Sequence, residues 1–221
     1  KGIPDRPSGT VLLPGVQNDL IKEIAKVNKN IILVVISGRT CAVSPVINDI
    51  KGLLYAFYPG QEGGKAIVDV LLGKYNPSGK LPATIPVDDS QIIPVSPDFR
   101  DMAYKGAGYR WLDYQGLKPQ FPFGYGLSYT TFEYGQLKID KTKASTGDRI
   151  HLSFDITNTG DRAGEEVAQL YLSLTKPEKK IEMPKKQLRG FKKIMLAPGE
   201  TKQVSFTLSA DDLLAYDEQS A

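Results

Sequence analysis

Residues 121–132 of the chain read FPFGYGLSYTTF, and the sequence changes character on either side of them. Within 121–126, one proline and two glycines exclude a regular helix, because proline lacks the amide proton and glycine loses the most backbone entropy on folding. Five aromatic rings in the twelve residues need a large surface to pack against. The stretch therefore predicts a tightly packed connection rather than a regular helix.

The residues before this stretch alternate between helical and strand patterns. Apolar residues recur at helical spacing over 16–27, whereas the short apolar runs at 30–37 and 52–58 are typical of strands buried on both faces. Further elements are expected at 45–50 (a short helix), after the turn 59–64 (a helix through Leu72, stopped by Gly73) and at 80–85 (an extended segment). This order predicts right-handed crossovers and a largely parallel sheet with helices, that is, an α/β domain.

The residues after the stretch are all-β in pattern. Apolar residues alternate with polar ones over 150–156 and again over 204–208, with turn signals at 158–161 and 198–199. Less regular strands are expected within 167–174 and 186–196. Short strands separated by turns favour a β-sandwich.

The sequence between these two patterns has a third character. Residues 86–120 are rich in proline, aspartate and glycine, and no period persists in them, so they predict a long surface excursion. We therefore expect a partial α/β domain over 1–97, a long linker over 98–132 and a β-sandwich domain over 133–221.

Composition and charge argue against several classes of function. The 221 residues carry a net charge of +3, and the basic side chains are dispersed. No apolar run reaches membrane-spanning length. The densest basic group fits a solvated loop and strand face better than a nucleic-acid surface; it consists of Lys179, Lys180, Lys185, Lys186, Lys192 and Lys193.

Single residues argue against several catalytic chemistries. Cys41 is the only cysteine, which excludes a disulfide within the chain and a cysteine-based zinc site. The only histidine, His151, is far in sequence from Ser37, which argues against a Ser–His–Asp triad. Glu62 precedes a helix, where the dipole favours a capping carboxylate over a catalytic one. We expect no metal, no cofactor and no nucleic-acid or membrane partner, and the compartment stays open.

Six segments together resemble family 3 of the glycoside hydrolases, the β-glucosidase and β-xylosidase family. They follow the family order and span nearly the whole chain; they are 12–21, 36–39, 58–64 with 69–73, 76–82, 121–132 and 158–164. The resemblance implies an α/β sandwich domain followed by a fibronectin type III-like domain, and we expect both to be truncated here. It also implies a retaining, exo-acting β-glycosidase that removes terminal glucosyl or xylosyl residues.

The resemblance implies two catalytic carboxyl groups that this chain does not supply. A retaining enzyme needs a nucleophile and an acid/base about 5–5.5 Å apart. In the family the nucleophilic aspartate lies on an N-terminal (β/α)₈ barrel, and the acid/base glutamate lies a few residues before an Asp-Arg pair. The matching stretch here, residues 1–6, has no glutamate, so we expect the acid/base upstream of Lys1 and the barrel portion as a partner. Asp5 and Arg6 are the candidate substrate-site residues, the alternative being a local ion pair that shapes a turn.

Other interpretations remain open at this point. The chain could be a non-catalytic carbohydrate-binding or scaffolding module, and a homodimer is possible. Tyr109, Arg110, Trp111 and Asp113 could line a sugar site, although packing of the linker is favoured. Tyr125 and Tyr129 are expected to pack between the domains.

Overall fold

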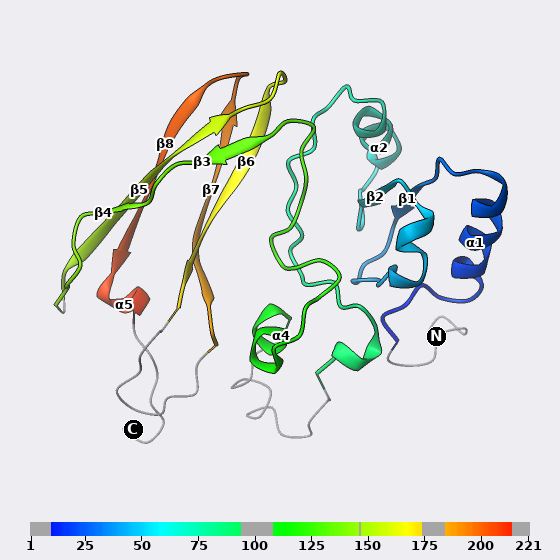
Figure 1. The fold of residues 1–221 in the computed structure, drawn as a ribbon, viewed down its shortest axis with the longest axis horizontal. Helices are drawn as coiled ribbons and strands as arrows, with labels where there is room; N and C mark the ends of the chain where they lie inside the picture. The colour runs from blue at the N-terminus through cyan, green and yellow to red at the C-terminus, as the bar shows by residue number, and fades with distance from the viewer. Residues whose placement is uncertain (1–9, 94–107, 146, 174–183, 214–221) are drawn as a thin grey trace. The chain divides into compact units, whose positions relative to one another are not determined.

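The computed structural model describes residues 10–93, 108–145, 147–173 and 184–213, and they form two compact units (Figure 1). The first, here called the α/β unit, holds the described residues of 10–74, 81–93 and 108–125. The second, here called the sandwich unit, holds 75–80 and the described residues of 126–213. The stretch FPFGYGLSYTTF is thus divided, with Phe121–Tyr125 in one unit and Gly126–Phe132 in the other.

The α/β unit is built on two parallel strands. The strands β1 (Ile32–Val35) and β2 (Gly52–Tyr55) pair in parallel, with Ile32 opposite Gly52. The helix α1 (Gln17–Val27) precedes β1, the 3₁₀ helix η1 (Ser44–Asp49) lies in the crossover, and α2 (Gly63–Leu71) follows β2. Gly73 has φ 71°, the left-handed conformation expected of a helix stop. These elements confirm the α/β pattern predicted from periodicity. The predicted burial of both strands on both faces is wrong, because Ile32 of β1 is 53% exposed and every residue of β2 is only half-buried.

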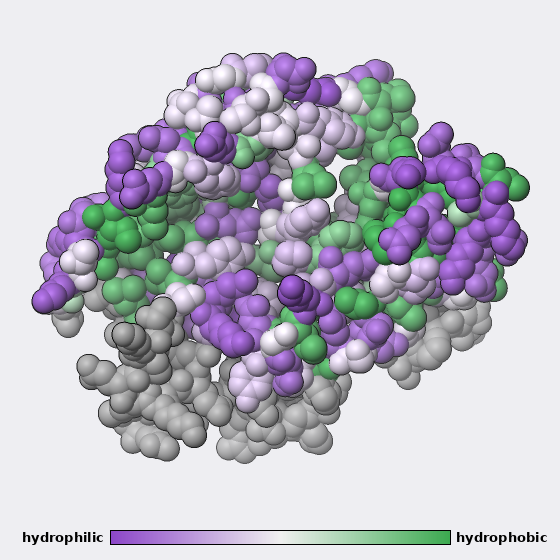
Figure 2. Space-filling view, viewed as in Figure 1, coloured by the Kyte–Doolittle hydropathy of each residue, from purple (hydrophilic) through white to green (hydrophobic). Residues whose placement is uncertain are grey.

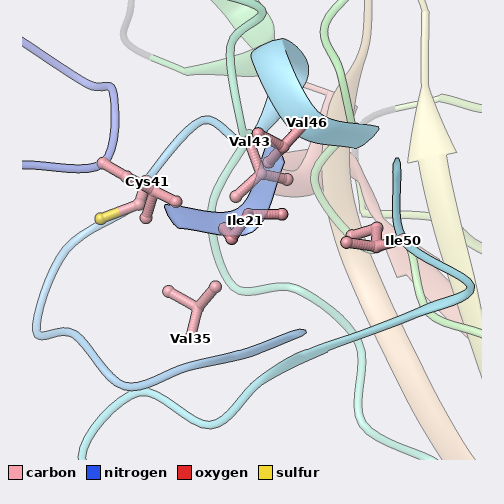
Figure 3. Packing of buried hydrophobic residues seen from close by; sticks show 7 residues of the cluster. Ile21, Val35, Cys41, Val43, Val46 and Ile50 are labelled. Atoms are coloured by element: carbon pink, nitrogen blue, oxygen red, sulfur yellow. The ribbon is translucent and has the colours of Figure 1, made fainter. Parts of the chain in front are cut away.

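The core of the α/β unit joins α1, β1 and the crossover. Figure 3 shows Ile21 of α1 pointing toward Val43 and Val46, which are fully buried, with Val35 of β1 and Ile50 nearby. Cys41 belongs to the same cluster and is buried as a free thiol. Burial of this apolar cluster is what holds the helix and the sheet together.

The extended segment expected at 80–85 forms no regular strand. Its backbone instead meets 121–125 in isolated bonds: the Leu81 amide donates to Tyr125 (2.8 Å), and Ile85 and Phe121 exchange bonds of 2.9 and 3.1 Å. Pro82 and Pro122 lack amide protons, so a continuous ladder cannot form between the two segments.

The excursion predicted over 86–120 holds two helices that the sequence pattern did not indicate. These are η2 (Asp89–Gln91) and α4 (Tyr109–Gln115). Gly108 (φ 61°) and Gly116 (φ 69°) flank α4, and Leu112 is its buried residue. A helix of seven residues is too short to establish a period, which explains the wrong prediction.

Two antiparallel sheets form the sandwich unit (Figure 1). The strand β5 pairs with β8 along one edge and with β3 and β4 along the other, while β6 pairs with β7. The bounds are β3 (Phe132–Tyr134), β4 (Lys138–Ile139), β5 (Arg149–Asn158), β6 (Gly164–Leu172), β7 (Gln187–Leu196) and β8 (Thr201–Ser209), followed by α5 (Ala210–Leu213).

The inward faces of the two sheets make one apolar core. The predicted alternation is confirmed, because Leu152 and Ile156 of β5 are buried with Val204, Phe206 and Leu208 of β8. Ala168 of β6 and Leu196 of β7 complete the cluster from the second sheet. Across the described ranges, no helix has both the length and the hydropathy to cross a membrane.

Candidate functional site

The predicted site residues Asp5 and Arg6 lie outside the described residues, so their role stays a prediction. The described residues offer another candidate at the carboxyl edge of the parallel sheet. Ligands of open α/β sheets bind beyond the carboxyl ends of parallel strands. Here the segment Ser37–Gly38–Arg39 follows β1, and Phe57 and Tyr58 follow β2.

At this edge one residue has a strained backbone, and a glycine packs closely against an aromatic ring. Phe57 has φ 51°, and no other described residue except glycine has a positive φ. Such a conformation costs on the order of 1–3 kcal/mol and is found most often at functional sites. Gly38 lies directly against the ring of Tyr58, and a Cβ at that position would overlap the ring atoms. Tyr58 is nevertheless 80% exposed, so its other face is open.

At the same edge, Arg39 has two guanidinium nitrogens without a hydrogen-bond partner in the described part of the chain. Its amide donates to Ser37 Oγ (3.3 Å), but its Nε and Nη2 atoms are shielded from solvent and have no partner among the described residues. Shielded N–H groups without acceptors are costly. The edge therefore presents two guanidinium nitrogens that can donate to a further acceptor.

The other sequence candidates lie in packed or capped positions. Glu62 occupies the N-cap position of α2, but its side chain makes no capping hydrogen bond, so that part of the expectation was wrong. His151 pairs through Nδ1 with Thr207 Oγ1 (3.0 Å) in the sandwich unit, which agrees with its exclusion as a triad base. In the described part of the chain, no three His, Cys, Asp or Glu side chains gather as they would around a metal ion.

The aromatic candidates of α4 pack rather than open toward a ligand. Tyr109 lies against Phe123 with ring centroids 5.3 Å apart, and the Arg110 guanidinium lies 5.9 Å from the Tyr109 centroid. Trp111 stacks on Tyr114 at 6.2 Å. These contacts support the packing interpretation over the sugar-site one.

Tyr125 and Tyr129, assigned from sequence to interdomain packing, make contacts within their own units. Tyr125 stacks on Phe121 at 5.4 Å in the α/β unit. The Arg162 guanidinium lies 5.5 Å from the Tyr129 centroid in the sandwich unit. The interdomain role stays a prediction.

Two adjacent carboxylates of β6, Glu165 and Glu166, were missed from the sequence. Glu165 accepts from Lys193 Nζ (2.6 Å) and Ser78 Oγ (3.0 Å), and these bonds lower the pKa of its carboxyl. Glu166 is 9% exposed and pairs with Lys80. A general acid needs a raised pKa, so the lowered one at Glu165 and the ion pair at Glu166 indicate structural roles.

Comparison with known proteins places this geometry in a family. A model of the glycosyl hydrolase family 3 C-terminal domain matches residues 5–129, and a fibronectin type III-like domain model matches residues 166–221. The chain is 38% identical over 219 residues to a β-glucosidase of Bacteroides ovatus. It is 39% identical over 217 residues to a xylan 1,4-β-xylosidase of Xylanibacter ruminicola. These alignments cover 94% and 98% of this chain but 29% and 23% of the relatives.

Solved structures agree with the sequence relatives. A family 3 β-glucosidase of Bifidobacterium adolescentis superposes with a TM-score of 0.85 at 32% identity, covering 95% of this chain and 31% of that one. β-Glucosidase 3B of Thermotoga neapolitana, solved with glucose, gives 0.84 at 35% identity, covering 98% and 32%. Because the first family model matches more than half of the 221 residues, the chain belongs to glycoside hydrolase family 3, of which it carries the C-terminal α/β domain and the fibronectin type III-like domain.

Proposed function

We propose that this chain is the C-terminal part of a retaining, exo-acting β-glycosidase that hydrolyses terminal β-glucosyl or β-xylosyl residues. In this proposal the α/β unit completes the active-site cleft, and the nucleophilic aspartate lies on a barrel portion outside this chain. The acid/base glutamate lies upstream of the Asp5–Arg6 pair.

The observation that carries the proposal is the mismatch in coverage. Almost all of this chain aligns with proteins described as β-glucosidases and xylosidases, yet it spans less than a third of their length. A glucose complex among the structural relatives favours a sugar as the ligand of the whole enzyme.

Exposed apolar residues of the α/β unit support a missing protein partner. Along α1, Leu20, Ile24 and Val27 are 58%, 40% and 89% exposed, and the preceding Val16 is 74% exposed. Val68 of α2 and the adjacent Leu72 are also exposed, and Figure 2 shows hydrophobic surface over α2. Apolar groups on two helices are typical of surfaces that bury against further protein.

Activity should require the upstream portion of the protein. We expect the chain alone to release no aryl alcohol from aryl β-glucosides or β-xylosides above the blank, because no nucleophile and acid/base pair is expected in it. The protein that includes the upstream barrel portion should turn over at least one of them, and proton NMR should detect the β-anomer of the sugar as the first product. Turnover by the purified chain alone, or a first product with the α-configuration, would contradict the proposal.

Arg39 should matter for activity although it is not expected to touch the reacting atoms. In the protein with the upstream portion, Arg39→Met is expected to lower kcat/KM about tenfold or more, equivalent to about 1.4 kcal/mol. The reason is that Nε and Nη2 of Arg39, which are shielded and without partners among the described residues, should meet an acceptor in the assembled cleft. Glu62→Gln, at an N-cap position without a capping bond, is the matched control and should stay within about twofold. Equal effects of the two changes would argue against a role for this edge.

A further inference from the structure

The turn Tyr75–Lys80 belongs to the sandwich unit, although α/β residues precede and follow it in sequence. Lys74 and Leu81, its direct neighbours along the chain, are both in the α/β unit. The chain therefore leaves the α/β unit for six residues and then returns. The contacts of those six residues show what holds them to the sandwich.

Both the oxygen and the nitrogen of the Asn76 side-chain amide form hydrogen bonds with other residues of the sandwich unit. Its Oδ1 accepts from Ser128 Oγ (2.9 Å) and from the Tyr129 amide (2.8 Å), and its Nδ2 donates to the Ala163 carbonyl (2.9 Å). Gly164 lies against the same amide, and a Cβ there would come within 2.7 Å of Asn76 Nδ2. Neither oxygen nor nitrogen of the amide is left without a partner, so the site fits this side chain closely.

Glu166 is a buried carboxylate of the sandwich unit whose cationic partner lies in the turn. Burial alternates along β6 so that Gly164, Glu166 and Ala168 are the buried positions, which directs the Glu166 carboxylate inward. Its Oε2 accepts from Lys80 Nζ (3.0 Å) and its Oε1 from the Tyr134 hydroxyl (2.9 Å). Burial, and then the nearby Glu166 charge, raise the pKa of Tyr134, so this hydroxyl stays a donor.

Lys80 of the turn supplies the positive charge that neutralises the Glu166 carboxylate. Its Nζ also donates to the Gly126 carbonyl (2.9 Å), and the two charged side chains are only 17% and 12% exposed. A buried carboxylate that loses its cation is strongly destabilising, whereas replacing both members by apolar groups is often tolerated. The 86 residues between Lys80 and Glu166 make this a long-range contact.

We infer that the sandwich unit carries a docking surface for the turn Tyr75–Lys80, with the Lys80–Glu166 pair at its centre, and that this turn makes the two units unfold together. Without the turn, Glu166 would be buried without its cation, and the partners of Asn76 would be unsatisfied. Because the turn is continuous with the α/β unit at both ends, unfolding of that unit would leave the turn between two flexible segments, whose chain entropy opposes its docking on the sandwich.

The chain contains one natural probe in each unit. Trp111, its single tryptophan, lies in α4 of the α/β unit, and His151, its single histidine, lies exposed on β5 of the sandwich unit. Equilibrium urea unfolding of the full chain can follow Trp111 by fluorescence and the His151 imidazole protons by NMR. We expect both probes to report the same midpoint in the unmodified chain; two separate midpoints would overturn the inference.

A double-mutant cycle tests the central pair. Lys80→Met is expected to lower the folded-to-unfolded ratio reported by His151 about a hundredfold, because it leaves Glu166 unpaired. Lys80→Met with Glu166→Leu should recover most of this loss, so the two changes are far from additive. Lys65→Met is the matched control, because Lys65 pairs with Asp69 at the surface and is 73% exposed, so it should change little.

Each outcome of the cycle bears on the inference. If Lys80→Met prevents folding altogether, the double variant decides, since recovery supports the docking surface and failure to recover overturns it. Additive losses, or a Lys80→Met loss no larger than that of Lys65→Met, would also overturn it. These readouts do not depend on glycosidase activity, so they stand apart from the proposed function.

Discussion

Replacing Asn158 by leucine is expected to lower the free energy of unfolding of the sandwich unit by about 4 kcal/mol, since each unsatisfied buried polar group costs about 1–3 kcal/mol. Asn158 is fully buried, and its Oδ1 accepts from Thr130 Oγ1 (2.6 Å) and the Gly160 amide (3.1 Å). Its Nδ2 donates to the carbonyls of Arg162 (2.8 Å) and Leu196 (3.1 Å). One side chain thus joins the stretch before β3, the turn after β5 and the end of β7.

Asn158→Asp removes the hydrogen-bond donor of this side chain while nearly keeping its shape. It keeps the acceptor but loses the two bonds from Nδ2 and places a charge beside two carbonyls. The new carboxyl should therefore have a folded pKa above its ordinary value of about 3.9. The stability of this variant should fall as the pH rises from that value through the folded pKa, and the loss should be smaller in acid.

Urea unfolding followed by circular dichroism and by His151 measures these changes. Thr159→Ala is the control, since the Thr159 hydroxyl pairs with that of Thr131 at the surface and should contribute about 0.5–1 kcal/mol. A loss below about 1 kcal/mol for Asn158→Leu would mean that the four bonds are replaceable by water or by rearrangement.

Local periodicity was sufficient to predict most of the regular elements. The strands β5 and β8 repeat apolar residues at every second position, and the structure buries the face that each pattern marks. The helix α1 forms where the 3.6-residue spacing predicts it, but of its apolar pattern only Ile21 is buried, while Leu20 and Ile24 are exposed. The failures are local in origin too. The helix α4 is too short to show a period, and residues 80–85 look extended but contain a proline that interrupts pairing.

The candidate site was far less predictable, because its features depend on contacts between distant residues. Nothing near Arg39 in sequence shows that its Nε and Nη2 atoms find no acceptor among the described residues, and nothing near Phe57 shows its left-handed backbone. Two consecutive glutamates in a strand resemble a solvated face, and only the fold shows that Glu166 points inward to Lys80. The sequence could indicate the family, but it could not indicate which charges are buried.

The two glycines of FPFGYG are required for different reasons. Gly124 has φ 77°, a left-handed conformation that costs other residues about 1–2 kcal/mol. Gly126 has no such backbone constraint, but a Cβ there would overlap the carbonyl oxygen of Gly79 and come within 3.1 Å of Lys80 Cδ. The first glycine allows a turn, and the second allows the chain to approach the turn Tyr75–Lys80.

Gly126→Ala is therefore expected to destabilise the sandwich unit by about 2–4 kcal/mol, at or above the usual range for overpacking. The obstacle is a backbone carbonyl, which cannot move aside as a flexible side chain would. Any shift of Gly126 also disturbs the bond from Lys80 Nζ to the Gly126 carbonyl, and with it the pairing of Glu166. The loss should appear as a lower urea midpoint for the His151 signal.

Substitutions of two further glycines serve as controls for Gly126→Ala. Gly124→Ala should cost about 1–2 kcal/mol through backbone strain. Gly64→Ala lies within α2 with no atom in the way, and it should be neutral or stabilising by up to about 1 kcal/mol. If Gly126→Ala were as stable as the unmodified chain while Gly124→Ala was not, the close approach to Gly79 would be wrong, and the docking of the turn on the sandwich unit would need a different geometry.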